Sequence, residues 1–342
     1  WLFTTLAFVL SAIIDNLTAT IVLITILQKI IKDKELRLWF AGLIVIAANA
    51  GGAWSPIGDV TTTMLWIANK VTPASLIEHV LLPSIACYAI PSFIASRMKI
   101  FKGQIDGELK EEESKSKHGA TMFYLGLGGI LFVPIFKTVT HLPPYVGMML
   151  SLAIISAVAE YLSNNEFTVA GATSGHGVNE PQHSPVHKSL SKIEMPSILF
   201  FLGILMAVAA LESLGMLYEF AGVLEKGVPM LGTEHGTTTL SDLVVILLGF
   251  GSAVIDNVPL VAASIGMFSM GLDAPEWHFI AYSAGTGGSI LVIGSAAGVV
   301  AMGMEKIDFF WYLKKIGGLA LIGFLAGSAV FIILRDFLLN AH

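Results

Sequence analysis

The chain has 342 residues, of which 55% are hydrophobic and only 13% are charged, and its formal net charge is −6. A soluble domain averages about 25% charged residues, so this composition indicates an integral membrane protein in a lipid bilayer. The charges fall in loops and form no basic patch, which argues against a nucleic-acid partner. The single cysteine, Cys87, excludes a disulfide scaffold and a cysteine-based metal site.

The first apolar stretch, residues 1–31, is interrupted at its centre by Asp15-Asn16-Leu17-Thr18. Each arm has about 13 to 15 residues, whereas a helix needs about 20 to cross a membrane. Two interpretations remain open. One is a single long helix with a buried acid, and the other is a re-entrant hairpin with Asp15 and Asn16 at its tip.

The second apolar stretch, residues 38–71, is interrupted between Asn49 and Asp59 by Gly51-Gly52 and by Ser55-Pro56-Ile57-Gly58. Glycine pairs and proline disrupt the hydrogen-bond ladder of a helix, so we predict a broken transmembrane helix. An ordinary span is expected next, at about residues 76–97.

The middle of the chain contains a charged loop, residues 99–118, and a polar loop, residues 163–192, with His176, His183 and His187. The histidine spacing fits no standard zinc site, and we expect a solvated loop. A pH-sensing role for these histidines stays an alternative. Spans are expected at about residues 121–137, 144–162 and 196–214, followed by a short amphipathic segment at 215–232.

The opening pattern then returns. Residues 239–270 have Asp256-Asn257-Val258-Pro259 at their centre, residues 277–304 contain Gly287-Gly288, and a last plain span is expected at 309–339. The hairpin segments match at an offset of 241 and the glycine pairs at an offset of 236. We therefore predict two repeats, each with a hairpin, a broken helix and a plain helix, an order that indicates a transporter binding site.

Charge bias predicts how these repeats are oriented. Lys and Arg are frequent in residues 29–37, 97–117 and 306–315 and absent from 72–78 and 269–276. Cytoplasmic loops carry the positive excess. The two halves are then inverted, and their hairpins enter from opposite sides to meet near the middle of the membrane.

Three acids, Asp15, Asp59 and Asp256, fall in the interrupted segments. An ionisable residue inside a membrane is a functional candidate, and a carboxylate beside an amide oxygen suits a hard cation. Exchange of the carboxyl proton for that cation is a sufficient mechanism for cation/proton exchange. The alternative is that these aspartates only cap short helices, but a cap requires no charge, since Ser or Asn suffices.

The sequence thus predicts a Na⁺ site at Asp15, Asn16, Asp256 and Asn257, with no catalytic residues and no cofactor besides the transported ions. Further ion or proton ligands are expected at Asp59, Thr18, Asn49, Ser55, Thr286, Ser289 and Ser295. The glycines expected to permit the helix breaks are Gly51, Gly52, Gly58, Gly287, Gly288 and Gly294.

Taken together, the two Asp-Asn hairpins and the two glycine-pair segments resemble the ion transporter superfamily, and most closely its NhaD-type sodium/proton antiporters. The segments that carry the resemblance are residues 11–20, 51–59, 256–259 and 285–295. The resemblance implies exchange of Na⁺, and also Li⁺, for H⁺ across a bacterial inner membrane. It further implies a homodimer with a scaffold domain and an elevator-like transport domain.

On this resemblance the chain divides into a transport half at 1–100, a cytoplasmic loop at 101–120, scaffold helices at 121–232 that include the polar loop 163–193, and a second transport half at 233–342. By symmetry, three scaffold helices of about 100 residues are expected to precede Trp1 in the whole protein.

Dicarboxylate symporters of the same superfamily typically have Ser-Asn-Thr at their hairpin tips, where this chain has Asp15 and Asp256. The added negative charges disfavour an anionic substrate. Sodium-coupled dicarboxylate symport and arsenite or anion permeation stay alternatives, as does a membrane scaffold or channel without coupled transport.

Overall fold

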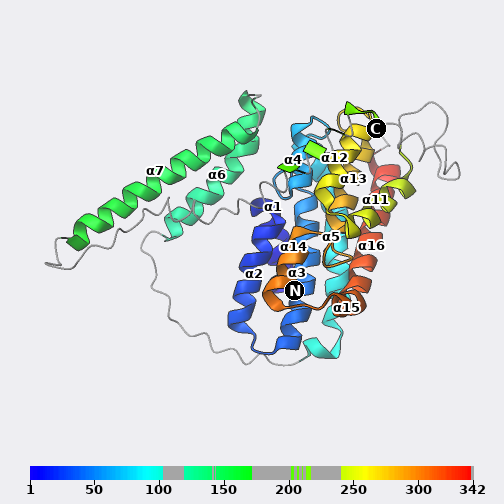
Figure 1. Cartoon of the computed structure of the whole chain (residues 1–342), viewed down its shortest axis with the longest axis horizontal. Coiled ribbons are helices and arrows are strands. Elements are labelled where there is room, and N and C mark those ends of the chain that lie inside the picture. The colour runs from blue at the N-terminus through cyan, green and yellow to red at the C-terminus, as the bar shows by residue number, and fades with distance from the viewer. Residues whose placement is uncertain are drawn as a thin grey trace. The chain divides into compact units, whose positions relative to one another are not determined.

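The computed structural model describes residues 1–102, 119–140, 142, 144–171 and 240–339, with isolated residues between 202 and 216. Every regular element in these ranges is helical, as predicted for an all-α membrane protein. The chain forms two compact units: unit 1 combines Trp1–Lys110 with Ile204–His342, and unit 2 is Glu111–Gly203. Within unit 1, Figure 1 shows long and short helices packed side by side.

The N-terminal part of unit 1 is a series of helices interrupted at the two polar segments. They are α1 (Leu2–Ile14), α2 (Asn16–Ile30), α3 (Lys34–Ala53), α4 (Val60–Ile67), α5 (Pro73–Ser96) and the 3₁₀ turn η1 (Lys99–Phe101). Asp15 alone separates α1 from α2, and the two helices pack against each other and against α3. The interpretation of residues 1–31 as one continuous helix is therefore wrong.

The C-terminal part of unit 1 follows a similar order. Its elements are α11 (Asp242–Val254), α12 (Asn257–Met267), α13 (Pro275–Gly287), α14 (Ala296–Glu305), α15 (Phe309–Tyr312), η3 (Leu313–Gly317), α16 (Gly318–Leu334) and η4 (Arg335–Leu339). The last span, expected at 309–339, is one helix over Phe309–Phe337, and the π-helical segments η3 and η4 lie within and at the end of it.

Each helical hairpin of unit 1 is fixed to the following long helix by a buried serine. Ser11 Oγ donates to Ala48 O at 2.5 Å, and Ser252 Oγ donates to Ala284 O at 2.6 Å. The hairpins approach so closely that a Cβ on Gly51 would lie 2.2 Å from Phe8 O. These contacts join α1 to α3 and α11 to α13.

Glycine shapes the two helix interruptions in different ways. Helix α3 continues through Gly51 and Gly52 and ends at Ala53, whereas α13 ends at Gly287 with Gly288 as its C-cap. A Cβ on Gly52 would lie 2.6 Å from Gly58 O, and one on Gly288 would lie 2.5 Å from Gly294 O. The glycines therefore permit close approach of the connecting loop in both halves, and in the second half they also lie at the end of the helix.

The short helices that follow the interruptions begin and end alike. Asp59 and Ser295, the N-caps of α4 and α14, have nearly the same backbone angles (φ −148°, ψ 152° and φ −150°, ψ 152°). Each helix is followed by a left-handed residue, Asn69 (φ 53°) and Lys306 (φ 54°). Sequence positions 236 or 237 residues apart thus adopt the same local structure.

Unit 2 is described here by α6 (Gly119–Thr140) and α7 (Pro144–Gly171), which pack against each other. Ser151 Oγ of α7 donates to Gly129 O of α6 at 2.9 Å. The polar loop was expected from residue 163, but α7 extends to Gly171. The histidines predicted in that loop lie outside the described residues, as do most of the residues in the segments expected at 196–214 and 215–232.

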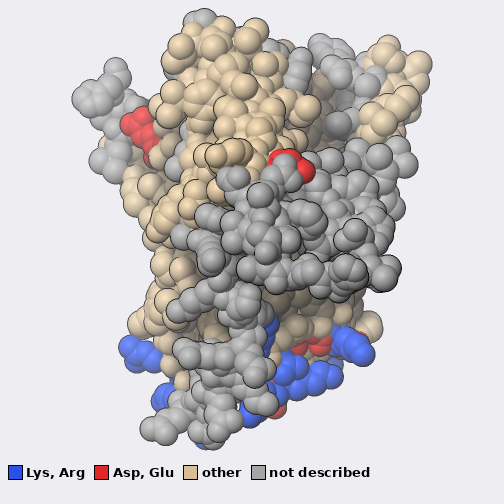
Figure 2. Space-filling view, turned by 90° about the vertical axis from the view of Figure 1, so that its left-hand side faces the viewer, with Lys and Arg blue, Asp and Glu red and all other residues tan. Residues whose placement is uncertain are grey.

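Three helices in the described ranges are long and apolar enough to cross a membrane: Lys34–Ala53, Pro73–Ser96 and Phe309–Phe337. Figure 2 shows Lys and Arg side chains gathered toward the lower end of the described surface. Most of the described Lys and Arg residues lie in the α2–α3 turn, in the end of α5 with η1, and between α14 and η3. This distribution agrees with an oriented membrane protein whose basic end faces the cytoplasm.

Candidate functional site

The side chain of Asp59 lies at the centre of a buried polar cluster. Asp59 is 4% exposed and caps α4 by accepting a hydrogen bond from Thr61 N at 3.4 Å. Its Oδ2 accepts from Asn16 Nδ2 at 3.2 Å and from Asn257 Nδ2 at 2.8 Å. Because Asn16 and Asn257 open α2 and α12, one carboxylate binds the tips of both hairpins.

Asn49 extends this cluster toward the second interruption. Its Oδ1 accepts from Asn16 Nδ2 at 3.2 Å, and its Nδ2 donates to Ser289 Oγ at 3.0 Å and to Ser295 Oγ at 2.8 Å. All of these side chains are at most 6% exposed. We call the connected set the asparagine cluster, and its members are Asn16, Asn49, Asp59, Asn257, Ser289 and Ser295.

Helix ends of both polarities meet at the asparagine cluster. Helices α2, α4, α12 and α14 begin at Asn16, Asp59, Asn257 and Ser295 or at the residue after one of them. Their N-terminal dipoles stabilise the Asp59 carboxylate. Helices α1, α3, α11 and α13 end nearby, and the terminal carbonyl groups of such half-helices are suited to binding a cation.

Asp15 lies beside this cluster but uses its carboxylate locally. Its Oδ1 accepts from Thr18 N at 2.7 Å and its Oδ2 accepts from Thr18 Oγ1 at 2.9 Å. Asp15 has φ 73° and ψ 160°, a backbone region that residues other than glycine rarely adopt. Both carboxylate oxygens therefore cap α2, and the exposed Thr18, predicted as an ion ligand, serves that cap.

Asp256 occupies the corresponding place in the second hairpin with a different environment. Among the described residues, no side-chain hydrogen bond caps α12, and Asp256 Oδ1 is buried without a partner. Both Asp15 and Asp256 lie within electrostatic range of Asp59. Three acidic side chains thus surround the tips of the hairpins.

Two other predicted ligands make local hydrogen bonds. Thr286 Oγ1 donates to Tyr282 O at 2.6 Å, within α13. Ser55 Oγ accepts from Ile57 N at 3.4 Å, within the α3–α4 connection. Of the predicted site residues, the structure joins Asn16, Asn49, Asp59, Asn257, Ser289 and Ser295 by hydrogen bonds, but not Asp15, Thr18, Ser55, Asp256 and Thr286.

Thr61 is a polar residue near the site that the sequence analysis missed. It is completely buried, lies two residues after Asp59, and its Oγ1 has no hydrogen-bond partner among the described residues. Buried hydroxyl groups are normally satisfied, so this oxygen is available for a ligand. The sequence signal was the run of three threonines that directly follows Asp59 and Val60.

The described residues contain no group of three His, Cys, Asp or Glu placed to hold a metal ion. A cation at this site would therefore need amide, hydroxyl or main-chain oxygens in addition to carboxylates. Such oxygen ligands suit a hard cation. A buried polar cluster among apolar helices, at the four breaks between consecutive helices, is typical of a membrane transporter.

Comparison with known proteins narrows this class. A family model described as "Citrate transporter" (CitMHS) matches residues 1–279. The chain belongs to this family. It is 41% identical to sodium/proton antiporter 1 of Arabidopsis thaliana over 98% of its own length, but it spans 55% of that relative.

The chain aligns with a larger share of two other relatives. Sodium/proton antiporter 2 of Arabidopsis thaliana is 38% identical, with 98% of this chain and 77% of the relative aligned. The Na⁺/H⁺ antiporter NhaD of Vibrio parahaemolyticus is 32% identical, with 92% and 76% aligned.

These names confirm the resemblance to NhaD-type antiporters and the class of transporter rather than enzyme. They support an integral membrane protein but not the predicted bacterial inner membrane, because plant proteins are among the relatives.

Proposed function

We propose that this protein exchanges Na⁺ for H⁺ across a membrane, with Li⁺ as an alternative cation. The observation that carries the proposal is the buried Asp59 carboxylate between the tip asparagines of both hairpins. Asp15 and Asp256 add negative charge within electrostatic range. The electrostatic repulsion within such a cluster of acids is relieved either by a proton or by a small cation. Competition between the proton and the cation for the cluster couples the movement of the two ions. Relatives named sodium/proton antiporters support the same chemistry.

The tip asparagines supply oxygen ligands by turning their amides. Asn16 and Asn257 now direct Nδ2 toward Asp59. An amide group presents either its NH₂ or its carbonyl oxygen, depending on what it faces. When Na⁺ replaces the proton, rotation of the two amides turns both Oδ1 atoms toward the ion. Thr61 Oγ1 and Asp256 Oδ1, both buried without partners, are the next ligands in this proposal.

We further propose that unit 1 contains two inverted repeats, each with a re-entrant hairpin and a broken helix. The paired serine hydrogen bonds, the matching N-caps at Asp59 and Ser295, and the matching left-handed residues support this assignment. The family resemblance supports alternating access by an elevator-like movement and a homodimeric assembly. In this scheme unit 1 contains the transport elements, and unit 2 belongs to the scaffold.

The experiment is Na⁺-driven proton movement by the full-length protein in proteoliposomes, followed with a pH-sensitive dye on either side of the membrane. We expect Na⁺ and Li⁺ to drive proton flux. Full exchange after both Asp59→Asn and Asp256→Asn would overturn the mechanism. Asp308→Asn is a matched control, because Asp308 also caps a helix, through Trp311 N at 2.9 Å, but is exposed.

The description of the matching family supports a second candidate, sodium-coupled uptake of citrate or a related anion. The converging helix N-termini favour it, since they attract anions. The asparagine cluster opposes it, because its ionisable member is a carboxylate. Uptake of labelled citrate or succinate, with arsenite efflux as a further arm, decides between them: anion flux without Na⁺-driven proton movement would replace the antiport proposal.

A further inference from the structure

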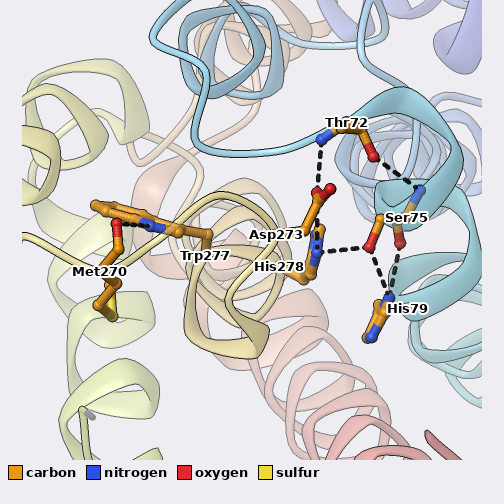
Figure 3. A network of polar contacts seen from close by, with 7 residues as sticks. All are labelled: Thr72, Ser75, His79, Met270, Asp273, Trp277 and His278. Atoms are coloured by element: carbon orange, nitrogen blue, oxygen red, sulfur yellow. Dashed lines mark hydrogen bonds and ion pairs between the residues drawn. The ribbon is translucent and has the colours of Figure 1, made fainter. Parts of the chain in front are cut away.

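A second polar network, partly buried, lies in unit 1 away from the asparagine cluster. Figure 3 shows it between the start of α5 and the turn that leads into α13. We call it the histidine cluster, and its members are Thr72, Ser75, His79, Asp273 and His278. It joins the turn that follows α4 to the turn that follows α12.

The two turns are joined by one main-chain hydrogen bond and by one hydrogen bond to a side chain. Asp273 N donates to Lys70 O at 2.9 Å, and Asp273 Oδ1 accepts from Thr72 N at 2.6 Å. Asp273 is left-handed, with φ 57°, and Trp277 Nε1 donates to Met270 O at 3.3 Å to close its own turn. The cluster therefore fixes the second half of unit 1 to the first half.

His278 lies at the centre of this contact and is fully buried. Its Nε2 is 3.0 Å from Ser75 Oγ and 3.6 Å from Asp273 Oδ1, and its ring stacks on His79 with centroids 4.5 Å apart. Its Nδ1 has no hydrogen-bond partner among the described residues. A buried ring nitrogen without a partner is rare, and the asparagine-cluster chemistry does not use it.

Protonation of His278 in this place is unfavourable. An imidazolium carries an N–H on both nitrogens, so Nδ1–H would be buried and unpaired beside a positive charge. The one facing carboxylate, Asp273, has a side chain that is 27% exposed, and its Oδ1 already accepts from Thr72 N. Burial therefore outweighs the attraction between the two groups.

Other charged groups on the elements packed around α13 do not relieve this cost. His79 on α5 adds repulsion if it is protonated. Lys70 lies over the Trp277 ring at 4.9 Å and is itself positive. Arg335, at the end of α16, is paired with Asp242 of α11 and with Asp336.

Asp59 also approaches α13: its Oδ2 would lie 3.9 Å from a Cβ on Gly285, seven residues beyond His278.

We propose that His278 makes this contact sensitive to protons: the histidine cluster is closed while His278 is neutral and opens when His278 binds a proton. The 24 residues of α5 place the cluster at the end of unit 1 opposite the basic residues Arg97 and Lys99. By the positive-inside rule this is the non-cytoplasmic end, so the proton comes from that side.

The direction of the pH dependence follows from the linkage between proton binding to His278 and opening of the cluster. In the open state His278 meets water and has the ordinary imidazole pKa of about 6.5. A closed state that excludes the proton is fully stable above that pH. Below that pH the closed-to-open ratio falls about fivefold over the first pH unit and close to tenfold for each further unit.

The test is hydrogen–deuterium exchange of the purified full-length protein in lipid nanodiscs at pH 5.5, 6.5, 7.5 and 8.5. Peptides that cover residues 69–76 and 269–278 report on the two turns. Wild type is compared with His278→Gln at each pH, which cancels the chemical pH dependence of exchange. We expect the wild-type to variant ratio of exchange rates to rise about fivefold between pH 6.5 and 5.5 and to stay nearly constant above pH 7.5.

A ratio that does not change with pH would overturn the proposal. If His278→Gln does not fold, His278→Phe keeps the ring stack on His79 without a titratable group. His79→Gln is the matched control and should retain the wild-type rise at low pH; loss of that rise only in His79→Gln would assign the sensor to His79 instead. Because the readout does not depend on transport, its failure is distinct from failure of the proposed antiport.

Discussion

The tips of the two hairpins carry the same Asp-Asn pair but use the aspartate differently. In the first hairpin both oxygens of Asp15 accept hydrogen bonds from Thr18, while in the second hairpin Asp256 Oδ1 is buried without a partner. The asparagines behave alike, since Asn16 and Asn257 both donate to Asp59. The amides are thus equivalent at the site, whereas the carboxylates are not.

The residue three positions after each aspartate explains this difference. In the first hairpin it is Thr18, which offers a main-chain N–H and a hydroxyl. In the second it is Pro259, which has neither donor. Asp15 is therefore satisfied as a helix cap, and Asp256 keeps a free oxygen near Asp59. A repeated sequence motif therefore predicts where its residues lie, while the neighbouring residues decide what the motif's side chains bind.

The largest effect is expected from the residue that both hairpins share. Asp59→Asn removes the charge that Asn16 and Asn257 bind and should lower Na⁺-driven proton movement by about 100-fold or more, since loss of even an outer ligand partner costs about 10- to 100-fold. Proteoliposome exchange measures it. The protein should remain folded, because Asn also caps helices well. An exchange rate within twofold of wild type would exclude Asp59 from the ion site.

The next prediction tests the difference between the hairpins directly. Asp256→Asn should reduce exchange by about tenfold or more, by the same measure of ligand loss. Asp15→Asn should leave exchange near the wild-type rate, because the amide oxygen still accepts from Thr18 N and the capping ability of Asn equals that of Asp. Equal losses in the two variants, measured side by side, would show that the aspartates act as an equivalent pair.

Much of this arrangement could be predicted from sequence. Polar residues at the centre of apolar stretches located the interruptions, and the Asp-Asn and Gly-Gly offsets paired them. The central position of Asp59 could not be predicted, because it depends on the fold of the α3–α4 connection, where the contact of Gly52 with Gly58 brings Asp59 between the hairpins. Thr61 was missed because one threonine in a run of three carries no distinguishing pattern.

A third prediction concerns a substitution that gives the second hairpin tip the hydrogen-bond donors of the first. Pro259→Thr supplies the N–H and hydroxyl that Thr18 supplies in the first hairpin, so Asp256 should become a cap and leave the site. The two added hydrogen bonds, together worth about 1 kcal/mol, should raise the Na⁺ concentration for half-maximal exchange about fivefold. Pro259→Ala, which adds only the N–H, should give an intermediate value. If neither variant shifts the Na⁺ dependence, hydrogen bonding at this position does not control Asp256.

The smallest effect is expected where the two halves are most alike. Ser11→Ala and Ser252→Ala each remove one buried hydrogen bond, to Ala48 O and to Ala284 O, that fixes a hairpin to the following helix. Each should lower the free energy of unfolding by about 1 kcal/mol without changing the Na⁺ dependence of exchange. Thermal unfolding in detergent micelles measures both variants under one condition. Since the two serines have the same burial and the same kind of acceptor, their losses should agree closely. A markedly larger loss for one serine would mean that the hairpins differ in their anchoring as well as in their carboxylates, and the contrast between the tips would then extend to the packing beneath them.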